Sequence, residues 1–348
     1  MIVRRAPFVA AGLSVTAALA LVAAAGSAVA KGPTCFGKPA TVVAPGPNGS
    51  AAVGTPGDDV LYSAAKNINI IGKGGDDRIC APHAGLIEGK DGADMLEGGD
   101  GASVFGNDGG DRLISLGGNS QLGGAGGDDV LIGGPGNNIL HGEEGDDRLY
   151  GEAGNDSFQA GPGDDFLYGG KGSDYLGAAT GNDTVVGDPG RSAGNDRLSG
   201  GPGNDDITGG PGNDSIDDTA GVDKIDGGDG NDAVETRADG DRDALVGGPG
   251  TDRVNYFRSH VGVRVTLDDV ANDGGHCPRS CEGDNVSSTF ELISGGAGDD
   301  TLVGDADANV IKGWKGDDAL DGGDGNDDCR GQEGTDTAAN CEMQTGIP

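Results

Sequence analysis

The sequence has few of the residues that normally fill a protein core. Aromatic residues make up 4% of its 348 residues and there is one tryptophan, whereas 73 residues are glycine. This composition excludes a thick apolar core of the usual kind. Bases are also scarce: 23 Lys and Arg face 58 Asp and Glu, for a formal net charge of −35. So acidic a chain repels phosphates, which argues against a nucleic-acid partner, and it stays disordered unless something neutralises the acids.

Several catalytic and metal-binding motifs are missing or out of context. No HExxH or CxxC occurs and the four histidines are isolated, so a zinc site is not expected. GRSAG (190–194) matches the serine-hydrolase pattern GxSxG, but no α/β pattern surrounds Ser192. After the N-terminal segment, no stretch outside the repeats described below is long enough for a catalytic domain. We therefore expect a protein without enzymatic activity.

Long apolar runs are confined to the N-terminus. MIVRR is followed by an apolar stretch, residues 6–25, and by the small residues Ala28–Ala30. This order predicts a signal peptide over residues 1–30 and a mature chain from Lys31. An uncleaved membrane anchor is the alternative, and the Arg4–Arg5 pair leaves the general and twin-arginine export routes open. We expect secretion in soluble form, with no membrane span after signal removal.

Cysteine is scarce, and all six cysteines lie in the mature part. An even number in an exported chain favours disulfides, although the sequence alone cannot choose among the possible pairings. Proximity along the chain favours Cys35–Cys80, Cys277–Cys281 and Cys329–Cys341.

What the chain does contain is a nine-residue repeat. The stretch GGPGNDDITGGPGNDSI, residues 200–216, shows one phrase twice. Ungapped units fill residues 124–186, 200–235 and 295–339, sixteen units in all. Their fourth residue is Gly in fifteen units, the sixth is Asp in fourteen and Asn in two, and the eighth is Leu, Ile, Val or Phe in fourteen. Three positions locked to one period are not expected from a glycine-rich linker.

The repeat predicts an all-β fold. Position eight is apolar within a segment long enough only for a short strand, and the glycines before it permit a tight turn. Two units then form one 18-residue coil, and stacked coils form a parallel β-roll, a right-handed β-solenoid with a thin aliphatic core. We expect a cap segment at 31–53, the roll at 54–255, a small strand–loop–strand insert at 256–294, further repeats at 295–339 and a tail at 340–348. Four extra residues between Asp183 and Asp196 predict a bulged loop.

The aspartates at position six should stack, because turns on the same edge of the roll are eighteen residues apart. Asp147 is expected over Asp165, and Asp156 over Asp174. Stacked carboxylates repel each other when they are partly desolvated, and a divalent cation between them removes the repulsion. Calcium suits this place best, because it accepts carboxylate and carbonyl oxygens in flexible geometry, whereas magnesium requires a stricter octahedron.

The pattern GGxGxDxUx resembles the nonapeptide of RTX, or haemolysin-type, calcium-binding proteins, from about Gly54 to Ala339. The resemblance implies a parallel β-roll with calcium held between adjacent turns by carbonyl groups and the position-six aspartate. Together with the less regular units, it predicts these calcium ligands: Asp59, Asp77, Asp94, Asp111, Asp129, Asp147, Asp156, Asp165, Asp174, Asp183, Asp196, Asp205, Asp214, Asp223, Asp232, Asp252, Asp300, Asp318 and Asp327. Asp336 is left open, because no later turn covers it.

Some acidic positions and some turns are expected to differ. Turns with Ile68, Ser103 or Ser120 in place of the acid should bind a cation poorly. Position-five acids, namely Asp128, Asp146 and Asp164, should face solvent. In the insert, Asp268, Asp273 and Asp284 either bind a further calcium or lie in a solvated loop.

The function expected from these features is secreted calcium binding. Without calcium the acids should keep the chain expanded, and with several calcium ions bound it should fold cooperatively along the repeats. The alternative is a cell-surface adhesin or surface-layer component in which calcium is purely structural. The sequence does not identify a cell-surface or matrix partner.

Overall fold

The computed structural model describes residues 33–42, 51–190, 194–217, 220–236, 238–271, 273–275 and 283–347. The expected signal peptide, Ser192 and the expected Cys277–Cys281 pair lie outside these residues. Every regular element within them is a strand. No helix that could cross a membrane occurs in this described part of the chain.

Most strands belong to two large sheets. The 16-stranded sheet consists of β4 (Ala52–Val53), β6 (Asn69–Gly74), β8 (Leu86–Asp91), β10 (Ser103–Asp108), β12 (Gln121–Gly126), β14 (Ile139–Glu144), β16 (Ser157–Pro162), β18 (Tyr175–Thr180), β20 (Arg197–Ser199), β22 (Ser215–Asp217), β24 (Ala233–Glu235), β26 (Arg253–Asn255), β30 (Leu292–Ser294), β32 (Val310–Lys315), β34 (Asp328–Glu333) and β36 (Met343–Thr345). The 13-stranded sheet consists of β3 (Thr41–Val42), β5 (Val60–Tyr62), β7 (Arg78–Ala81), β9 (Met95–Gly98), β11 (Arg112–Ser115), β13 (Val130–Ile132), β15 (Arg148–Ala153), β17 (Phe166–Lys171), β19 (Thr184–Val186), β21 (Asp206–Thr208), β23 (Lys224–Asp226), β25 (Ala244–Val246) and β29 (Asn285–Val286).

Two smaller sheets complete the fold. The five-stranded sheet consists of β27 (Val263–Thr266), β28 (Gly274–Gly275), β31 (Thr301–Val303), β33 (Ala319–Asp321) and β35 (Thr337–Ala339). A hairpin near the N-terminal end pairs β1 (Thr34–Cys35) with β2 (Lys38–Pro39).

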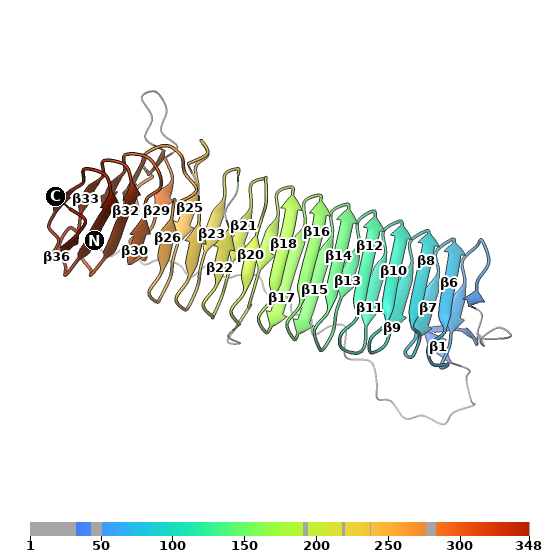
Figure 1. Ribbon diagram of the computed structural model, residues 1–348. Helices are drawn as coiled ribbons and strands as arrows, with labels where there is room; N and C mark the ends of the chain where they lie inside the picture. Colours follow the sequence, from blue (N-terminus) through green and yellow to red (C-terminus); the bar gives the residue numbers. More distant parts are fainter. Residues whose placement is uncertain are drawn as a thin grey trace, which may run out of the picture. The chain divides into compact units, whose positions relative to one another are not determined.

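From β4 to β26 the strands alternate between the two large sheets along the chain, so each coil contributes one strand to each sheet (Figure 1). Paired strands are parallel and eighteen residues apart in the regular part: Leu131 lies opposite Leu149, and Leu140 opposite Phe158. The parallel β-roll with 18-residue coils is therefore confirmed.

The core of the roll is the single row of position-eight side chains from each sheet. Leu131, Leu149 and Leu167 from the 13-stranded sheet face Leu140 and Phe158 from the 16-stranded sheet, and all are at most 1% exposed. Each such side chain contributes roughly 1.5–3 kcal/mol by leaving water. Because only one residue in nine is buried this way, the turns must supply much of the remaining stabilisation.

Position four shows why the turns need glycine. Gly163 has a φ of 148°, and a Cβ added there would lie 1.9 Å from the carbonyl oxygen of Gly145 in the preceding coil. Any side chain at this position would therefore force the coils apart as well as strain the backbone.

The insert begins after β26, where the chain leaves the two large sheets. β27 starts the five-stranded sheet, whereas β29 and β30 return to pair with β25 and β26. Buried Tyr256, Val265 and Phe290 extend the core through this region. The small β insert is thus confirmed, and its last strands belong to the two large sheets.

Two disulfides fasten the ends of the roll. Cys35–Cys80 ties the N-terminal hairpin to β7, and Cys329–Cys341 ties β34 to the segment before β36. Both pairings were predicted from proximity along the chain and are confirmed.

Candidate metal centres in the turns

The turns carry rows of side chains at position six, here called ladders. The first ladder precedes the strands of the 13-stranded sheet and consists of Asp59, Asp77, Asp94, Asp111, Asp129, Asp147, Asp165, Asp183, Asp205, Asp223, Asp243 and Asp284. The second ladder precedes strands of the 16-stranded sheet and consists of Ser120, Asn138, Asp156, Asp174, Asp196, Asp214, Asp232, Asp252 and Glu291, with a separate continuation of Asn309, Asp327 and Glu342. The third ladder precedes the five-stranded sheet and consists of Asp300, Asp318 and Asp336. All nineteen aspartates predicted from the sequence lie in these ladders.

From Asp77 onward, each ladder aspartate uses one oxygen to join its coil to an earlier part of the roll. Asp147 Oδ1 accepts the N–H of Asp129 at 2.8 Å, and Asp165 Oδ1 accepts the N–H of Asp147 at 2.7 Å. On the other edge, Asp174 Oδ1 accepts the N–H of Asp156 at 2.7 Å. The carboxylates are therefore stacked, as the eighteen-residue spacing predicts.

The second oxygen of most ladder aspartates is buried without a hydrogen bond. Among the described residues, no partner exists for Oδ2 of Asp77, Asp94, Asp111, Asp129, Asp147, Asp156, Asp165, Asp174, Asp183, Asp196, Asp205, Asp214, Asp232, Asp252, Asp318, Asp327 and Asp336. Burying an unpaired polar atom is costly, more so when it is charged. A row of such atoms at regular intervals leaves these turns open to a group from outside the chain.

One turn shows what the second oxygen faces. Asn138 occupies the ladder position in the turn before β14, and its Oδ1 accepts the N–H of Ser120 at 2.9 Å, as an aspartate would. Its Nδ2 donates to the carbonyl oxygens of Gly134 at 3.2 Å and Gly136 at 2.9 Å. An aspartate in this place puts an oxygen where Asn138 has an N–H group, so acceptors face acceptors with no donor between them.

A carbonyl group of the next coil also lies close to the second oxygen of the ladder aspartate, beside the glycine that begins the repeat unit. A Cβ added to Gly151 would lie 2.4 Å from Asp156 Oδ2 and 2.5 Å from the carbonyl oxygen of Gly169. A Cβ on Gly142 would meet Asp147 Oδ2 at 2.1 Å and the Ala160 carbonyl oxygen at 2.8 Å. Oxygens from two consecutive coils therefore converge in a cradle that glycine leaves open.

This donor set fits a hard cation. No three His, Cys, Asp or Glu side chains gather into a metal cluster within the part of the chain that the structure describes. The ligands available to each ion are therefore one or two carboxylate oxygens and backbone carbonyls. Calcium accepts such a set of six to eight oxygens, whereas zinc sites are built from cysteine and histidine side chains.

The charges in the ladders strengthen this conclusion. Burial raises the pKa of Asp129 to about 8 and the pKa values of Asp165 and Asp174 to about 7. The bound N–H of the neighbouring turn lowers each pKa in part, and adjacent carboxylates raise it further. Ionised ladders are thus unfavourable in the metal-free fold at neutral pH, and a divalent cation beside them reverses this preference.

The second edge lacks acids in the first coils of the roll. Ser103 pairs with Gln121, so Ala102, which is fully buried, occupies the row of Ser120. The expectation that Ser103 replaces the acid is therefore wrong, and Ala102 takes that position instead. The preceding coil is seventeen residues long rather than eighteen, so counting in nines along the sequence ends one residue too far. Ile68 lies in the same row and is 4% exposed. These turns are closed by apolar or small side chains.

The sequence analysis missed four acidic members of the ladders. Asp243 Oδ1 accepts the N–H of Asp223 at 2.9 Å across twenty residues, and Asp284 Oδ1 accepts the N–H of Asp243 at 3.1 Å across forty-one. Glu291 and Glu342 end stretches of the second ladder by accepting the N–H groups of Asp252 and Asp327. Their spacings depart from the repeat, so a strict nine-residue period could not find them.

Two acids of the insert are buried, so the solvated-loop expectation is wrong for them. Asp273 is 1% exposed and accepts the N–H groups of Thr266 at 2.6 Å and Val286 at 3.2 Å. Asp284 is also 1% exposed, and its Oδ2 accepts the hydroxyl hydrogen of Tyr256 at 3.1 Å. Backbone and hydroxyl donors, which the sequence pattern does not reveal, hold both side chains inside. Asp268 is exposed as expected.

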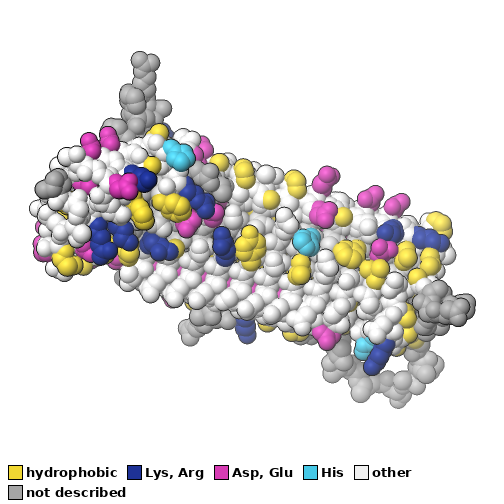
Figure 2. All heavy atoms as spheres, in the orientation of Figure 1, with side chains coloured by type: hydrophobic (Ala, Val, Ile, Leu, Met, Phe, Trp, Pro, Cys, Tyr) yellow, Lys and Arg dark blue, Asp and Glu magenta, His cyan; other side chains and the backbone are white. Residues whose placement is uncertain are grey.

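The position-five side chains form a second, outer row. Asp128, Asp146 and Asp164 are exposed, as predicted. Asp128 Oδ1 also accepts the N–H of Asp146 at 3.1 Å, and Asp146 Oδ1 that of Asp164 at 2.9 Å. On the other edge this row is largely asparagine: Asn137 Oδ1, for example, accepts the N–H of Asn155 at 2.9 Å. Few acids show on the face of the molecule in Figure 2, in keeping with the burial of the ladder aspartates.

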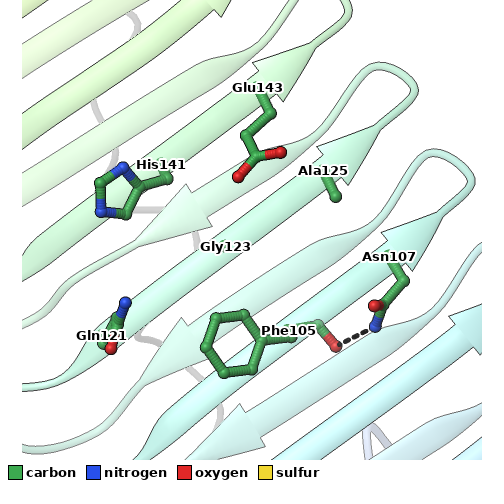
Figure 3. A pocket seen from close by; sticks show the side chains of 7 residues that line it. All are labelled: Phe105, Asn107, Gln121, Gly123, Ala125, His141 and Glu143. Atoms are coloured by element: carbon green, nitrogen blue, oxygen red, sulfur yellow. Dashed lines mark hydrogen bonds between the residues drawn. The ribbon is translucent and has the colours of Figure 1, made fainter.

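A shallow hollow lies on the outer face of the 16-stranded sheet. Its volume is about 200 Å³, and it lies where Gly123 has no side chain between Phe105 and His141 (Figure 3). Glu143 and His141 line it, but no hydrogen bond joins these two within the described chain. The side chains stand apart along three strands, with no nucleophile beside the imidazole. The hollow therefore does not have the geometry of a nucleophile and its base.

Comparison with protein families gives a match. A family model described as the RTX calcium-binding nonapeptide repeat (4 copies) matches residues 86–102, 105–140, 123–158, 141–176, 150–185, 192–216, 208–242 and 294–329. These ranges cover just over half of the chain and include most of the ladder turns. No curated protein matches the sequence.

Proposed function

Because the chain belongs to the family with RTX calcium-binding nonapeptide repeats, we propose that it is a secreted protein that folds on binding several calcium ions between its turns. The proposed ligands are the position-six aspartates together with carbonyl groups of their own and adjacent turns. The protein has no catalytic role in this proposal. Calcium binding and the resulting order of the roll are its function.

The observation that supports this proposal best is the row of buried Oδ2 atoms. In the turn of Asn138 an amide donor satisfies the facing carbonyl groups, whereas in the aspartate turns a metal ion is the group that can do so. Since the ions bind only the folded chain, their binding free energy adds directly to its stability.

Secretion is proposed from the N-terminal segment and the two disulfides. Cys35–Cys80 and Cys329–Cys341 fit an oxidising compartment, because disulfides do not persist in a reducing cytosol. Fractionation of cells that produce the protein tests this directly. Recovery of the mature chain from the medium supports the proposal, and retention inside the cell contradicts it.

The test of calcium-coupled folding is a calcium titration of the full mature chain, followed by far-UV circular dichroism and by calorimetry. We expect the metal-free chain to be largely disordered at pH 8 and to gain β-structure cooperatively with several bound ions. The double variant Asp156→Asn with Asp174→Asn should bind fewer ions. The remaining turns should still order the roll.

The matched control is Asp146→Asn with Asp164→Asn. It removes the same number of charges from exposed position-five side chains and keeps the acceptor oxygens of the outer row. Its calcium stoichiometry should equal that of the parent protein. If both double variants lose the same number of ions, or neither loses any, the ladder aspartates are not the ligands.

A further inference from the structure

The hollow on the outer face of the 16-stranded sheet is shaped by one glycine. One outward-facing row of this sheet consists of Glu88, Phe105, Gly123, His141, Gln159 and Gly177. A Cβ added to Gly123 would lie 2.8 Å from Cδ1 and 3.2 Å from Cε1 of Phe105. The half-buried Phe105 ring therefore leans over the backbone of Gly123 and forms one wall of the hollow, whose volume is about 200 Å³ (Figure 3).

The other large side chains around the hollow are polar. Gln121 and Glu143 are exposed, and His141 is half-buried. None of these three side chains forms a hydrogen bond or an ion pair with the described part of the chain. Asn107 differs from them, because its Nδ2 donates to the carbonyl oxygen of Gly106 at 2.9 Å. An amide, an imidazole and a carboxylate are thus available to a ligand, beside one aromatic ring.

This combination restricts the chemistry of the ligand. Glu143 and the net charge of −35 repel anions such as nucleotides. A purely apolar ligand would cover the polar side chains and leave them without partners, which is costly. The ligand that suits the hollow is uncharged, carries several hydroxyl groups and has one apolar face. A pyranose ring has these properties, because its axial C–H groups pack against the electron-rich face of an aromatic ring while its hydroxyl groups donate to and accept from polar side chains.

A second aromatic side chain leans over a glycine farther along the same sheet. Tyr175 on β18 is 51% exposed, and its Cε1 would lie 3.8 Å from a Cβ added to Gly177. Gly177 belongs to the same row as Gly123, three strands away. At about 4.8 Å per strand, the two glycines are roughly 14 Å apart. This outer face therefore offers two aromatic surfaces to one short, extended chain of sugars.

We propose that the outer face of the 16-stranded sheet binds a neutral oligosaccharide, with one pyranose ring in the hollow at Phe105 and another against Tyr175. In the hollow, Gln121, His141 and Glu143 form hydrogen bonds with the hydroxyl groups of the ring. The hollow is smaller than the roughly 300–1,000 Å³ of pockets that enclose a drug-sized ligand, so each ring binds weakly and affinity rises with the length of the sugar chain. Because β10, β12 and β14 together build the hollow, it exists only when the coils are stacked.

The test is affinity electrophoresis of the full mature chain at saturating calcium, in native gels that contain dextran, galactomannan, xyloglucan or, as an acidic comparison, dextran sulfate. We expect at least one neutral polymer to retard the parent protein. Phe105→Ala should weaken this binding about tenfold, because the stacked ring is lost. The matched control is Phe166→Ala, which removes a half-buried ring from β17 in the 13-stranded sheet and should bind like the parent.

Two further variants test the polar side chains and the second aromatic surface. Gln121→Ala changes an exposed side chain that forms no hydrogen bond with the described chain, so it should weaken binding about three- to tenfold at unchanged stability. Tyr175→Ala should also weaken binding of the polymer, since one of the two aromatic surfaces is then missing. Circular dichroism at saturating calcium shows whether each variant reaches the parent fold.

Several results would overturn the inference. One is a parent protein that none of the neutral polymers retards, or that dextran sulfate alone retards. Another is retardation that Phe105→Ala and Gln121→Ala leave unchanged, or that Phe166→Ala reduces equally, because the polymer would then bind elsewhere. A parent chain that stays disordered with calcium would instead contradict the proposed function, so the two failures are distinguishable.

Discussion

Removal of calcium at pH 8 should unfold the roll, and acid alone should then order it again. In the unfolded chain a free aspartate titrates near 3.8, whereas burial in the metal-free fold raises the pKa of Asp77 to about 6 and that of Asp129 to about 8. The folded state therefore keeps protons that the unfolded state has released. Its stability is lowest above these raised pKa values and rises as the pH falls from about 8 towards 4.

The size of the effect follows from the shifts. One pKa unit corresponds to about 1.4 kcal/mol, so ionising a side chain whose pKa moves from 3.8 to about 7, as for Asp165, costs the fold on the order of 4 kcal/mol above that pH. A pKa of about 7 applies to Asp111, Asp165, Asp174, Asp196, Asp205 and Asp214. Folded domains are more stable than their unfolded chains by only about 5–15 kcal/mol, so ionisation of these six ladder aspartates is enough to unfold a metal-free roll.

The assay is far-UV circular dichroism with size-exclusion chromatography in metal-stripped buffer at pH 8, 7, 6 and 5. We expect an expanded chain at pH 8 and a compact β-rich chain at pH 5. Calcium added at pH 6 should release protons, which a weakly buffered titration records. The reasoning fails if the metal-free chain is equally ordered at pH 8 and pH 5, or if it stays disordered at pH 5 while calcium orders it at pH 8.

Three further substitutions test separate parts of the structure. Asn138→Asp should replace the donor that closes its turn and add one calcium ion to the stoichiometry of the parent, as measured by calorimetry; an unchanged count would contradict the fit of the cradle. Gly151→Ala should remove one ion, because its Cβ would lie 2.4 Å from Asp156 Oδ2. It should also lower the free energy of unfolding, measured by denaturant titration, by a few kcal/mol, about the cost of overpacking. Gly126→Ala is the control in the same titration, since a Cβ at Gly126 meets nothing within 4 Å. Replacing Cys35 and Cys80 with serine should lower the free energy of unfolding of the calcium-loaded protein by about 4 kcal/mol, from the chain entropy of a loop spanning 45 residues; no change would show that the N-terminal hairpin contributes nothing to the cooperative unit.

The regular part of the fold could be predicted because its period is enforced by geometry. Position four needs glycine where carbonyl groups of the preceding coil approach, as at Gly163, and position eight needs an apolar side chain, as at Leu167. These requirements recur in most coils, so they leave a pattern that can be counted. The stacking of Asp147 on Asp165 follows from the same count.

The remaining features depend on contacts that leave no periodic trace. The register of Ala102 follows from coils of seventeen residues, and Asp243 joins its ladder across a coil of twenty. The burial of Asp273 depends on N–H groups of two strands that meet only in the folded insert. Asp188 stands at the position in its turn where Glu143 and Glu152 are exposed, so the sequence does not show that its side chain is buried.

The most direct test of the central claim is a crystal structure of the full mature chain grown with calcium. We expect electron density for an ion about 2.3–2.6 Å from the Oδ2 atoms of the ladder aspartates and from carbonyl oxygens of neighbouring coils. The turn closed by Asn138 should hold none. Ordered density for the same roll with only water at hydrogen-bonding distance from these oxygens would contradict the account.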